Sequence, residues 1–169
     1  SPTTAEAVTE EIGIYLDSDD LVLDGGLCLV GIESTIIDCT GSAPKILRPG
    51  AITDELVESL LSIKTSEKNE DNEIKAPGLL ESHYAPKADI FLDKEAEKGG
   101  GFIALATIPT PEGVIRLASP KTIEQFARDL YAAFRSADHQ GLKKVSVITP
   151  DGDGLAIAIR DRLKKASNG

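Results

Sequence analysis

The second half of the chain alternates strand and helix signals, and this alternation restricts the fold more than any other feature. The β-rich runs lie at 89–92, 101–107, 113–117 and 144–149, and the helical stretches at 120–137 and 154–166. Within the first helical stretch, with Ser119 as its expected cap, the apolar residues recur at helical spacing on one face. Alternation of this kind predicts a small parallel sheet covered by helices. We therefore expect an α/β domain over residues 88–169.

The first 63 residues carry a different set of signals. Thr3, with Glu6 three residues on, has the spacing of a capping box and predicts a helix start. An apolar run at 27–30 and the stretch 34–38 are both strand-like, and 45–47 reads as the returning strand of a hairpin. Thr53 is the expected cap of a helix over 54–63.

Residues 64–87 separate these two parts. The stretch is polar, lacks periodicity and contains two prolines, which is typical of a linker. It nevertheless carries the apolar and aromatic string LLESHYAP. We expect this string to dock on a folded surface.

Charge divides the chain unevenly. The net charge is −10, and residues 1–63 hold twelve acids against the two cations Lys45 and Arg48, whereas the remainder balances. An acidic stretch of this kind is usually a solvated face; the alternative is a segment that packs against a basic partner. The acidic balance also argues against nucleic acid or an anionic membrane as a partner.

The remaining composition narrows the class of protein further. Two cysteines, Cys28 and Cys39, provide neither a disulfide framework nor a metal-ligand set. No apolar run approaches the roughly 20 residues of a membrane-spanning helix, and no signal-peptide pattern is visible. These features predict a cytoplasmic protein. Because the chain contains no Met and opens at Ser1, we expect it to be a piece of a longer protein.

Two motifs in the N-terminal part have the chemistry of an anion site. In GIEST, Gly31 permits a tight bend, and Ser34 and Thr35 present hydroxyls beside backbone amides. In LRPG, the Pro-Gly pair constrains the backbone beside Arg48, whose guanidinium suits phosphate or carboxylate. Two alternatives stay open, namely that the hydroxyls bond local backbone and that Arg48 forms an internal salt bridge.

Other candidate motifs indicate a particular chemistry less specifically. His83 and Tyr84 place a titratable ring beside an aromatic one, suited either to a nucleotide or to anchoring the linker. The string DGDG at 151–154 lacks the later ligands of a calcium loop and predicts a glycine-rich junction between strand and helix. A set of cations near the end is expected to be solvated surface: Lys143, Lys144, Arg160, Arg162, Lys164 and Lys165.

Taken in order, the strings SPTTAEAV, LDGG, GIESTIID, ILRPGAIT and SHYAPKA resemble the second half of the YrdC-like domain of threonylcarbamoyl-AMP synthase in its long two-domain form. The later strings LYAAFRSAD and GLAIAIRDRLKKA resemble the C-terminal accessory domain of that form. The resemblance implies part of an open, twisted YrdC-like α/β domain over 1–63, a linker over 64–87 carrying SHYAP, and a small Rossmann-like parallel α/β domain over 88–169.

The resemblance also implies an activity. The family joins L-threonine, bicarbonate or carbon dioxide, and ATP into threonylcarbamoyl-AMP and pyrophosphate, with Mg²⁺ on the ATP phosphates. The product serves tRNA modification through a separate threonylcarbamoyl transferase complex, so no direct contact with nucleic acid is expected. The reaction requires no protein nucleophile and no protein-bound metal, and positioning and charge stabilisation provide the catalysis.

Residue roles follow from the same resemblance. Ser34 would contact threonine or the adenylate phosphate, Arg48 an ATP phosphate, and Tyr84 with His83 would close over the nucleotide. Thr4, at the start of the first helix, ranks lower as a phosphate contact.

The family's basic motif and a Ser-Asn-Ser-Gly stretch would precede Ser1. We therefore expect this chain by itself to be inactive and to bind ATP weakly. The alternative is a non-enzymatic α/β module that binds a ligand or partner.

Overall fold

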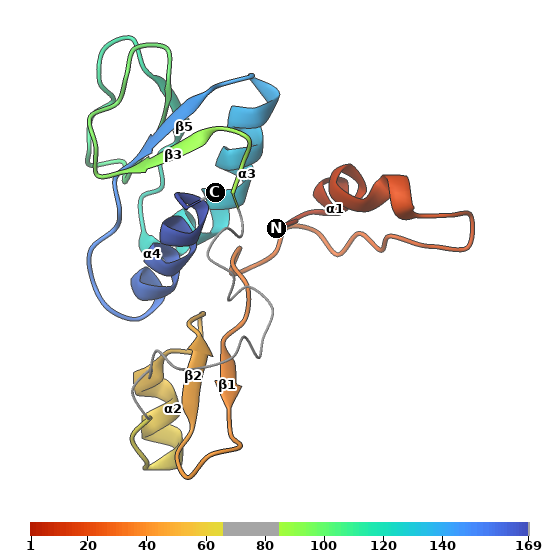
Figure 1. The fold of residues 1–169 in the computed structure, drawn as a ribbon, viewed down its shortest axis with the longest axis vertical. Coiled ribbons are helices and arrows are strands. Elements are labelled where there is room, and N and C mark those ends of the chain that lie inside the picture. Colours follow the sequence, from red (N-terminus) through yellow and green to blue (C-terminus); the bar gives the residue numbers. More distant parts are fainter. Residues whose placement is uncertain (66–84, 169) are drawn as a thin grey trace.

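The computed structural model describes residues 1–65 and 85–168. These residues form a parallel sheet with two helices packed on it, an antiparallel hairpin beside a short helix, and an extended arm (Figure 1). In chain order the elements are α1 (Ala5–Ile12), η1 (Gly13–Tyr15), β1 (Ile36–Asp38), β2 (Lys45–Arg48), α2 (Asp54–Leu61), β3 (Asp89–Leu92), β4 (Gly101–Ile103), β5 (Ile115–Ala118), α3 (Ile123–His139), β6 (Lys144–Val147) and α4 (Leu155–Ala166).

The C-terminal part is the parallel α/β sheet that the sequence predicts. Its strand order is β3-β6-β4-β5, and each neighbouring pair is parallel. The run at 89–92 is β3 itself, whereas β4 and β6 end before the predicted 107 and 149. A glycine-rich junction at 151–154 leads into α4, as predicted, with Gly154 at its N-cap.

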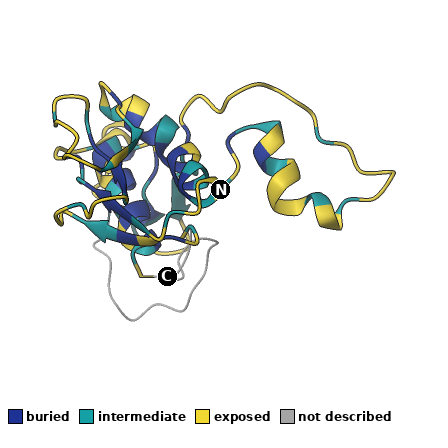
Figure 2. Cartoon of the chain, turned by 90° about the horizontal axis from the view of Figure 1, so that it is seen from above, coloured by how far each residue is buried: buried dark blue, intermediate teal, exposed yellow. Residues whose placement is uncertain are grey.

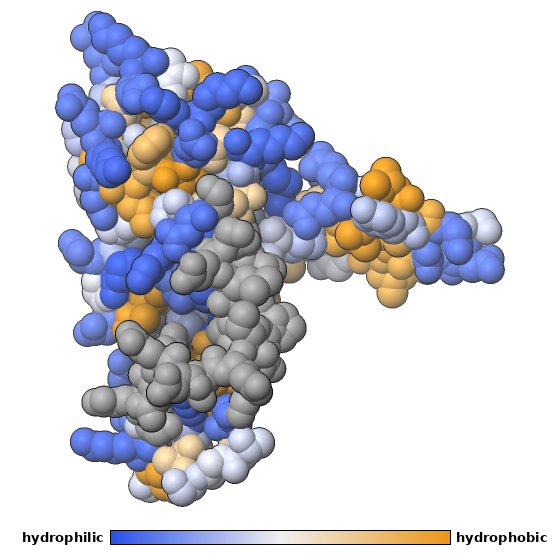
Figure 3. Space-filling model, in the orientation of Figure 1, coloured by the Kyte–Doolittle hydropathy of each residue, from blue (hydrophilic) through white to orange (hydrophobic). Residues whose placement is uncertain are grey.

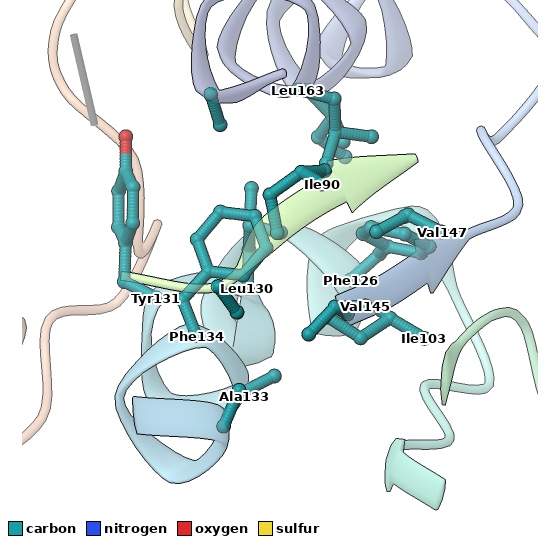
Figure 4. Packing of buried hydrophobic residues seen from close by; sticks show 14 of the residues in the cluster. Ile90, Ile103, Phe126, Leu130, Tyr131, Ala133, Phe134, Val145, Val147 and Leu163 are labelled. Carbon is teal, nitrogen blue, oxygen red and sulfur yellow. The ribbon is translucent and has the colours of Figure 1, made fainter. Parts of the chain in front are cut away.

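One apolar cluster holds this part together. It joins side chains of both helices to three of the strands, and Figure 4 shows Leu130 and Phe126 of α3, Leu163 of α4, and Ile90 and Val145 of the sheet converging. Each fully buried side chain of this kind contributes about 1.5–3 kcal/mol relative to exposure. The predicted apolar face of α3 is confirmed, since it is the part of α3 that packs into the cluster.

The start of α3 differs from the prediction. The N-cap is Thr122, whose hydroxyl accepts from the amide of Gln125 at 3.3 Å, and not Ser119. Pro120 lies outside the helix because its carbonyl accepts a hydrogen bond from the amide of Ala106 at 2.8 Å. The residues that were predicted as the first turn of this helix therefore belong to the loop before it.

The start of α1 shifts in the same way. Thr4 is the N-cap and accepts from the amide of Ala7 at 3.1 Å, so the prediction of Thr3 was wrong by one residue. Thr3 is buried instead, and its hydroxyl accepts a hydrogen bond from Arg135 of α3 at 3.0 Å. The Thr3 hydroxyl, which the local spacing assigned to capping, therefore bonds a residue far away in the sequence instead.

The predicted hairpin is confirmed. β1 and β2 pair antiparallel, with Asp38 opposite Lys45 and Ile36 opposite Arg48. The helix that follows is capped by Thr53 as predicted, but α2 ends at Leu61.

We call residues 5–30 the arm. It comprises α1, η1 and an extended return, and it projects to the side of the other elements (Figure 1). The apolar run at 27–30, predicted as a strand, is not one. The amide of Cys28 donates to the carbonyl of Thr3 at 2.9 Å, but no strand among the described residues lies beside the run to pair with it.

The arm and its neighbours expose an unusual amount of apolar surface. Of fifteen exposed large apolar side chains in the described residues, thirteen lie within residues 1–63. Figure 2 shows the arm as mostly exposed, and Figure 3 shows apolar atoms gathered on it. Leu21, Leu23 and Leu29 are 80%, 82% and 87% exposed. Contiguous apolar surface of this kind marks a region that associates with other surfaces.

None of the helices within the described ranges combines the length and the apolar character needed to cross a membrane.

We predict that the chain associates with itself as its concentration rises, because burial of the arm's leucines is favourable. Replacing Leu21, Leu23 and Leu29 together by Ser should shift sedimentation velocity toward the monomer. The control is Ile157→Ser on α4, which removes an exposed apolar side chain outside the arm. Equal association by the triple variant and the parent would contradict the prediction.

Candidate functional site

Two of the sequence-predicted site residues meet at the open end of the hairpin. Ser34 lies just before β1 and Arg48 ends β2, so strand pairing brings them together. Arg48 is buried, and its Nε donates to the carbonyl of Ser34 at 3.0 Å. Its Nη2 lies 3.5 Å from the hydroxyl oxygen of Ser34. The guanidinium and the hydroxyl are thereby held side by side.

The contacts with Ser34 show how the guanidinium of Arg48 is oriented. These hydrogen bonds go to neutral oxygens of Ser34. A neutral carbonyl or hydroxyl oxygen orients a guanidinium without contributing a negative charge of its own. The arrangement therefore suits an anionic ligand that contacts the hydroxyl and the guanidinium together.

Glycines permit the close packing around this pair. A Cβ on Gly50 would lie 2.4 Å from the amide nitrogen of Thr35, so the LRPG segment rests directly on the GIEST segment. Gly31 has a φ of +84°, as the expected tight bend requires, and a Cβ there would lie 2.3 Å from the Cα of Arg128 on α3. The GIEST backbone therefore lies against the backbone of α3.

Charged residues that were not predicted as site residues bind the site to the C-terminal part. Arg162 of α4 is fully buried, and its Nε donates to the carboxylate of Glu33 at 2.8 Å. The hydroxyl of Tyr131 on α3 donates to the same oxygen at 2.9 Å. Arg162 Nη2 also donates to the carbonyl of Pro49 at 3.0 Å, and Nη1 to Asp161 at 2.6 Å. The expectation that Arg162 is solvated surface was wrong.

The two partners of this ion pair stabilise each other's charged forms. Burial alone would raise the pKa of the Glu33 carboxyl, but hydrogen bonds with Ser1 and Arg162 and the charge of Arg162 hold the pKa below its usual range. Burial would likewise lower the pKa of Arg162, but the hydrogen bond and the charge of Glu33 raise it. Both groups are therefore ionised at neutral pH.

A periodic signal in the sequence points to Arg162. The buried residues of α4 include Ala158, Ile159, Leu163 and Ala166. Position 162 falls on their face, because residues three and four apart share one side of a helix. A cation on that face needs a buried acidic partner.

The other predicted site residues are placed differently. Thr4 caps α1 and lines an open hollow of about 420 Å³ between α1 and the return of the arm, which also includes Val22 and Leu27. Within the described residues the structure shows no hydrogen bond between Thr4 and either Ser34 or Arg48. His83 and Tyr84 lie outside the described residues.

We predict that Gly31→Ala is strongly destabilising. Gly26 has nearly the same φ, +81°, with open space around it, so Gly26→Ala isolates the cost of a left-handed alanine, about 1–2 kcal/mol. Gly31→Ala adds a collision with the backbone of α3 and should cost more. Thermal unfolding of the two variants measures the loss of stability in each. A melting temperature for Gly31→Ala at or above that of Gly26→Ala would contradict this account of the packing.

Comparisons with known proteins converge on one family. The family model for the C-terminal domain of threonylcarbamoyl-AMP synthase matches residues 52–168. The threonylcarbamoyl-AMP synthase of Pyrococcus abyssi is 32% identical over 190 residues, covering 99% of this chain and 54% of that protein. The Bacillus subtilis protein of the same name is 29% identical over 189 residues, covering 100% of this chain and 54% of that protein.

Solved structures agree. The crystal structure of P. abyssi Sua5 complexed with L-threonine has a TM-score of 0.80 and 30% identity, and covers 99% of this chain and 54% of that one. A double variant of Sua5, in which a His and the Tyr after it are Ala, has a TM-score of 0.75 and 28% identity, covering 99% and 53%. The chain thus spans about half the length of the relatives that it matches. With 117 consecutive residues matched by the family model, the chain belongs to the threonylcarbamoyl-AMP synthase family.

Proposed function

We propose that this chain acts as part of an L-threonylcarbamoyladenylate synthase, a nucleotidyltransferase of tRNA threonylcarbamoyladenosine synthesis. The observation that carries the proposal is the contact of Arg48 with Ser34, in a chain that resembles a threonine-bound family structure. The substrates are L-threonine, bicarbonate or carbon dioxide, and ATP as its magnesium complex. The product is passed to a separate threonylcarbamoyl transferase complex, without direct contact between this chain and tRNA.

The chemistry needs no covalent bond to the protein. The amine of threonine attacks carbon dioxide, losing a proton and forming a carbamate. A carbamate oxygen then attacks the α-phosphorus of ATP, the bond to the β-phosphate oxygen breaks, and pyrophosphate leaves with the bonding electrons. Catalysis of such steps comes from orienting the reactants and stabilising charge on the phosphoryl oxygens.

The residues of this chain supply part of that environment. Arg48 offers a fixed positive charge to a phosphate oxygen, and the Ser34 hydroxyl beside it donates to threonine or the adenylate phosphate. Tyr84 and His83 would contact the nucleotide. Thr4, which caps α1, would be a further phosphate contact.

The excess of acids in residues 1–63 limits how tightly this chain by itself can bind ATP. An ATP triphosphate carries about four negative charges, and residues 1–63 offer it two cations among twelve acids. We therefore infer that ATP binding by this chain in isolation is weak. Calorimetric titration with MgATP tests this directly, and micromolar binding would contradict it.

Within a complete synthase that carries this chain, Arg48→Ala should lower threonine- and bicarbonate-dependent pyrophosphate release by about a hundredfold or more, the usual cost of removing a charge-stabilising donor. Lys45→Ala is the matched control, because it removes the other cation of the segment from the opposite end of β2.

Lys45→Ala should leave the rate close to that of the parent. Unchanged release in Arg48→Ala would contradict the enzymatic role of this site and favour a non-enzymatic binding module.

A further inference from the structure

Arg162 belongs to the C-terminal helix α4, yet it reaches both segments of the candidate site. Its Nε bonds the Glu33 carboxylate at 2.8 Å, and its Nη2 bonds the Pro49 carbonyl at 3.0 Å. Glu33 directly precedes Ser34, and Pro49 directly follows Arg48. One guanidinium therefore touches the immediate neighbour of each site residue.

The shape of the guanidinium gives these contacts a geometric consequence. The group is planar and rigid, so donors on Nε and Nη2 lie at a fixed separation. When one donor bonds the GIEST segment and the other the LRPG segment, the spacing between the two segments is fixed as well. That spacing governs whether Arg48 Nε can reach the Ser34 carbonyl, which it does at 3.0 Å.

Arg162 is itself held in place. Its Nη1 donates to Asp161 at 2.6 Å, and Asp161 also accepts from Lys165 at 2.8 Å. The Glu33 carboxylate receives a second hydrogen bond from Tyr131, whose hydroxyl points away from the apolar cluster in Figure 4. Both ends of the contact are thus anchored in helices of the C-terminal core.

If Arg162 served only to hold the two parts of the chain together, its contacts could lie anywhere along their boundary. Here the ion pair, the Pro49 contact and the packing of Gly31 on α3 all converge on the two motifs that hold Ser34 and Arg48. The convergence distinguishes a positioning role from general adhesion.

We propose that Arg162 is a positioning residue of the candidate site, through which the C-terminal domain sets the relative placement of Ser34 and Arg48. The proposal rests on the proposed function for the identity of the ligand, but the geometry that it predicts is measurable without ligand.

The first experiment measures hydrogen exchange of arginine Nε–H groups by NMR in the 169-residue chain. Exchange reports local opening of the hydrogen bond that protects each group. In Arg162→Met, the Arg48 Nε–H should exchange about tenfold faster or more. The Arg116 Nε–H, which donates to the Ala118 carbonyl at 2.7 Å in the far part of the sheet, should be unchanged and serves as the internal reference.

Two further variants distinguish the role of the Arg162 guanidinium from a general effect of changing α4 and from an effect of charge alone. Arg160→Met is the matched control, since Arg160 lies on the same helix and bonds the carbonyls of Pro150 and Gly152 within the C-terminal domain. It should leave Arg48 exchange unchanged. Arg162→Lys keeps the charge but loses the planar fork, so exchange should stay fast; restored protection would show that charge alone suffices and would overturn the proposal.

If Arg162→Met fails to fold, Glu33→Gln takes its place, because it weakens the same contact while leaving Asp161 to pair with the buried arginine. Wild-type exchange at Arg48 in a folded variant of either kind would overturn the proposal.

The second experiment adds ligand and tests the function separately. In a complete synthase that carries the chain, Arg162→Met should raise the KM for threonine or ATP and lower kcat/KM, whereas Arg160→Met should not. If the parent enzyme releases no pyrophosphate, the proposed function fails while the exchange result still decides the positioning role. If exchange responds but KM and kcat do not, the positioning role is overturned.

Discussion

The arrangement of the site depends on the ion pair between the buried Arg162 and the half-buried Glu33. Removing Arg162 and Glu33 from water is costly, and close hydrogen bonds offset that cost only when their geometry is good. Arg162 is fully buried and meets Glu33 at 2.8 Å, Pro49 at 3.0 Å and Asp161 at 2.6 Å. The GIEST and LRPG motifs are consequently attached to the C-terminal core through α3 and α4. The C-terminal part therefore supports the site, although none of the predicted site residues lies in it.

The arm is held to α3 by more exposed contacts, in which Glu10 lies 3.6 Å from His139 and Glu11 lies 3.9 Å from Arg135. The arm touches the core near its origin, where Arg135 bonds Thr3 at 3.0 Å, and then extends with most of its leucines exposed. Exposed apolar surface and excess negative charge lie in the same 63 residues. The same stretch therefore combines a site that is bonded to the C-terminal core with an arm that is mostly exposed.

Local patterns predicted most of the fold but not the contacts between distant residues. The β3 range, the hairpin, the apolar face of α3 and the Thr53 cap all follow from periodicity and turn chemistry within short windows. Caps moved to Thr4 and Thr122 because nearby residues were occupied by partners outside the window. Ser34 and Arg48 were each predicted as site residues, and the predicted hairpin brings them together, whereas Glu33 and Arg162 are 129 positions apart and join only through the tertiary fold.

Glu33 and Arg162 act as a unit that joins the site to the C-terminal core. A double-mutant cycle with Glu33→Gln, Arg162→Met and the double variant measures this through the free energy of unfolding. The single changes should be far from additive, with a coupling free energy of about 2 kcal/mol, because each of them removes the same contact between Glu33 and Arg162, which the second change cannot remove again. Additivity within about 0.5 kcal/mol would contradict it, since independent sites behave in that way.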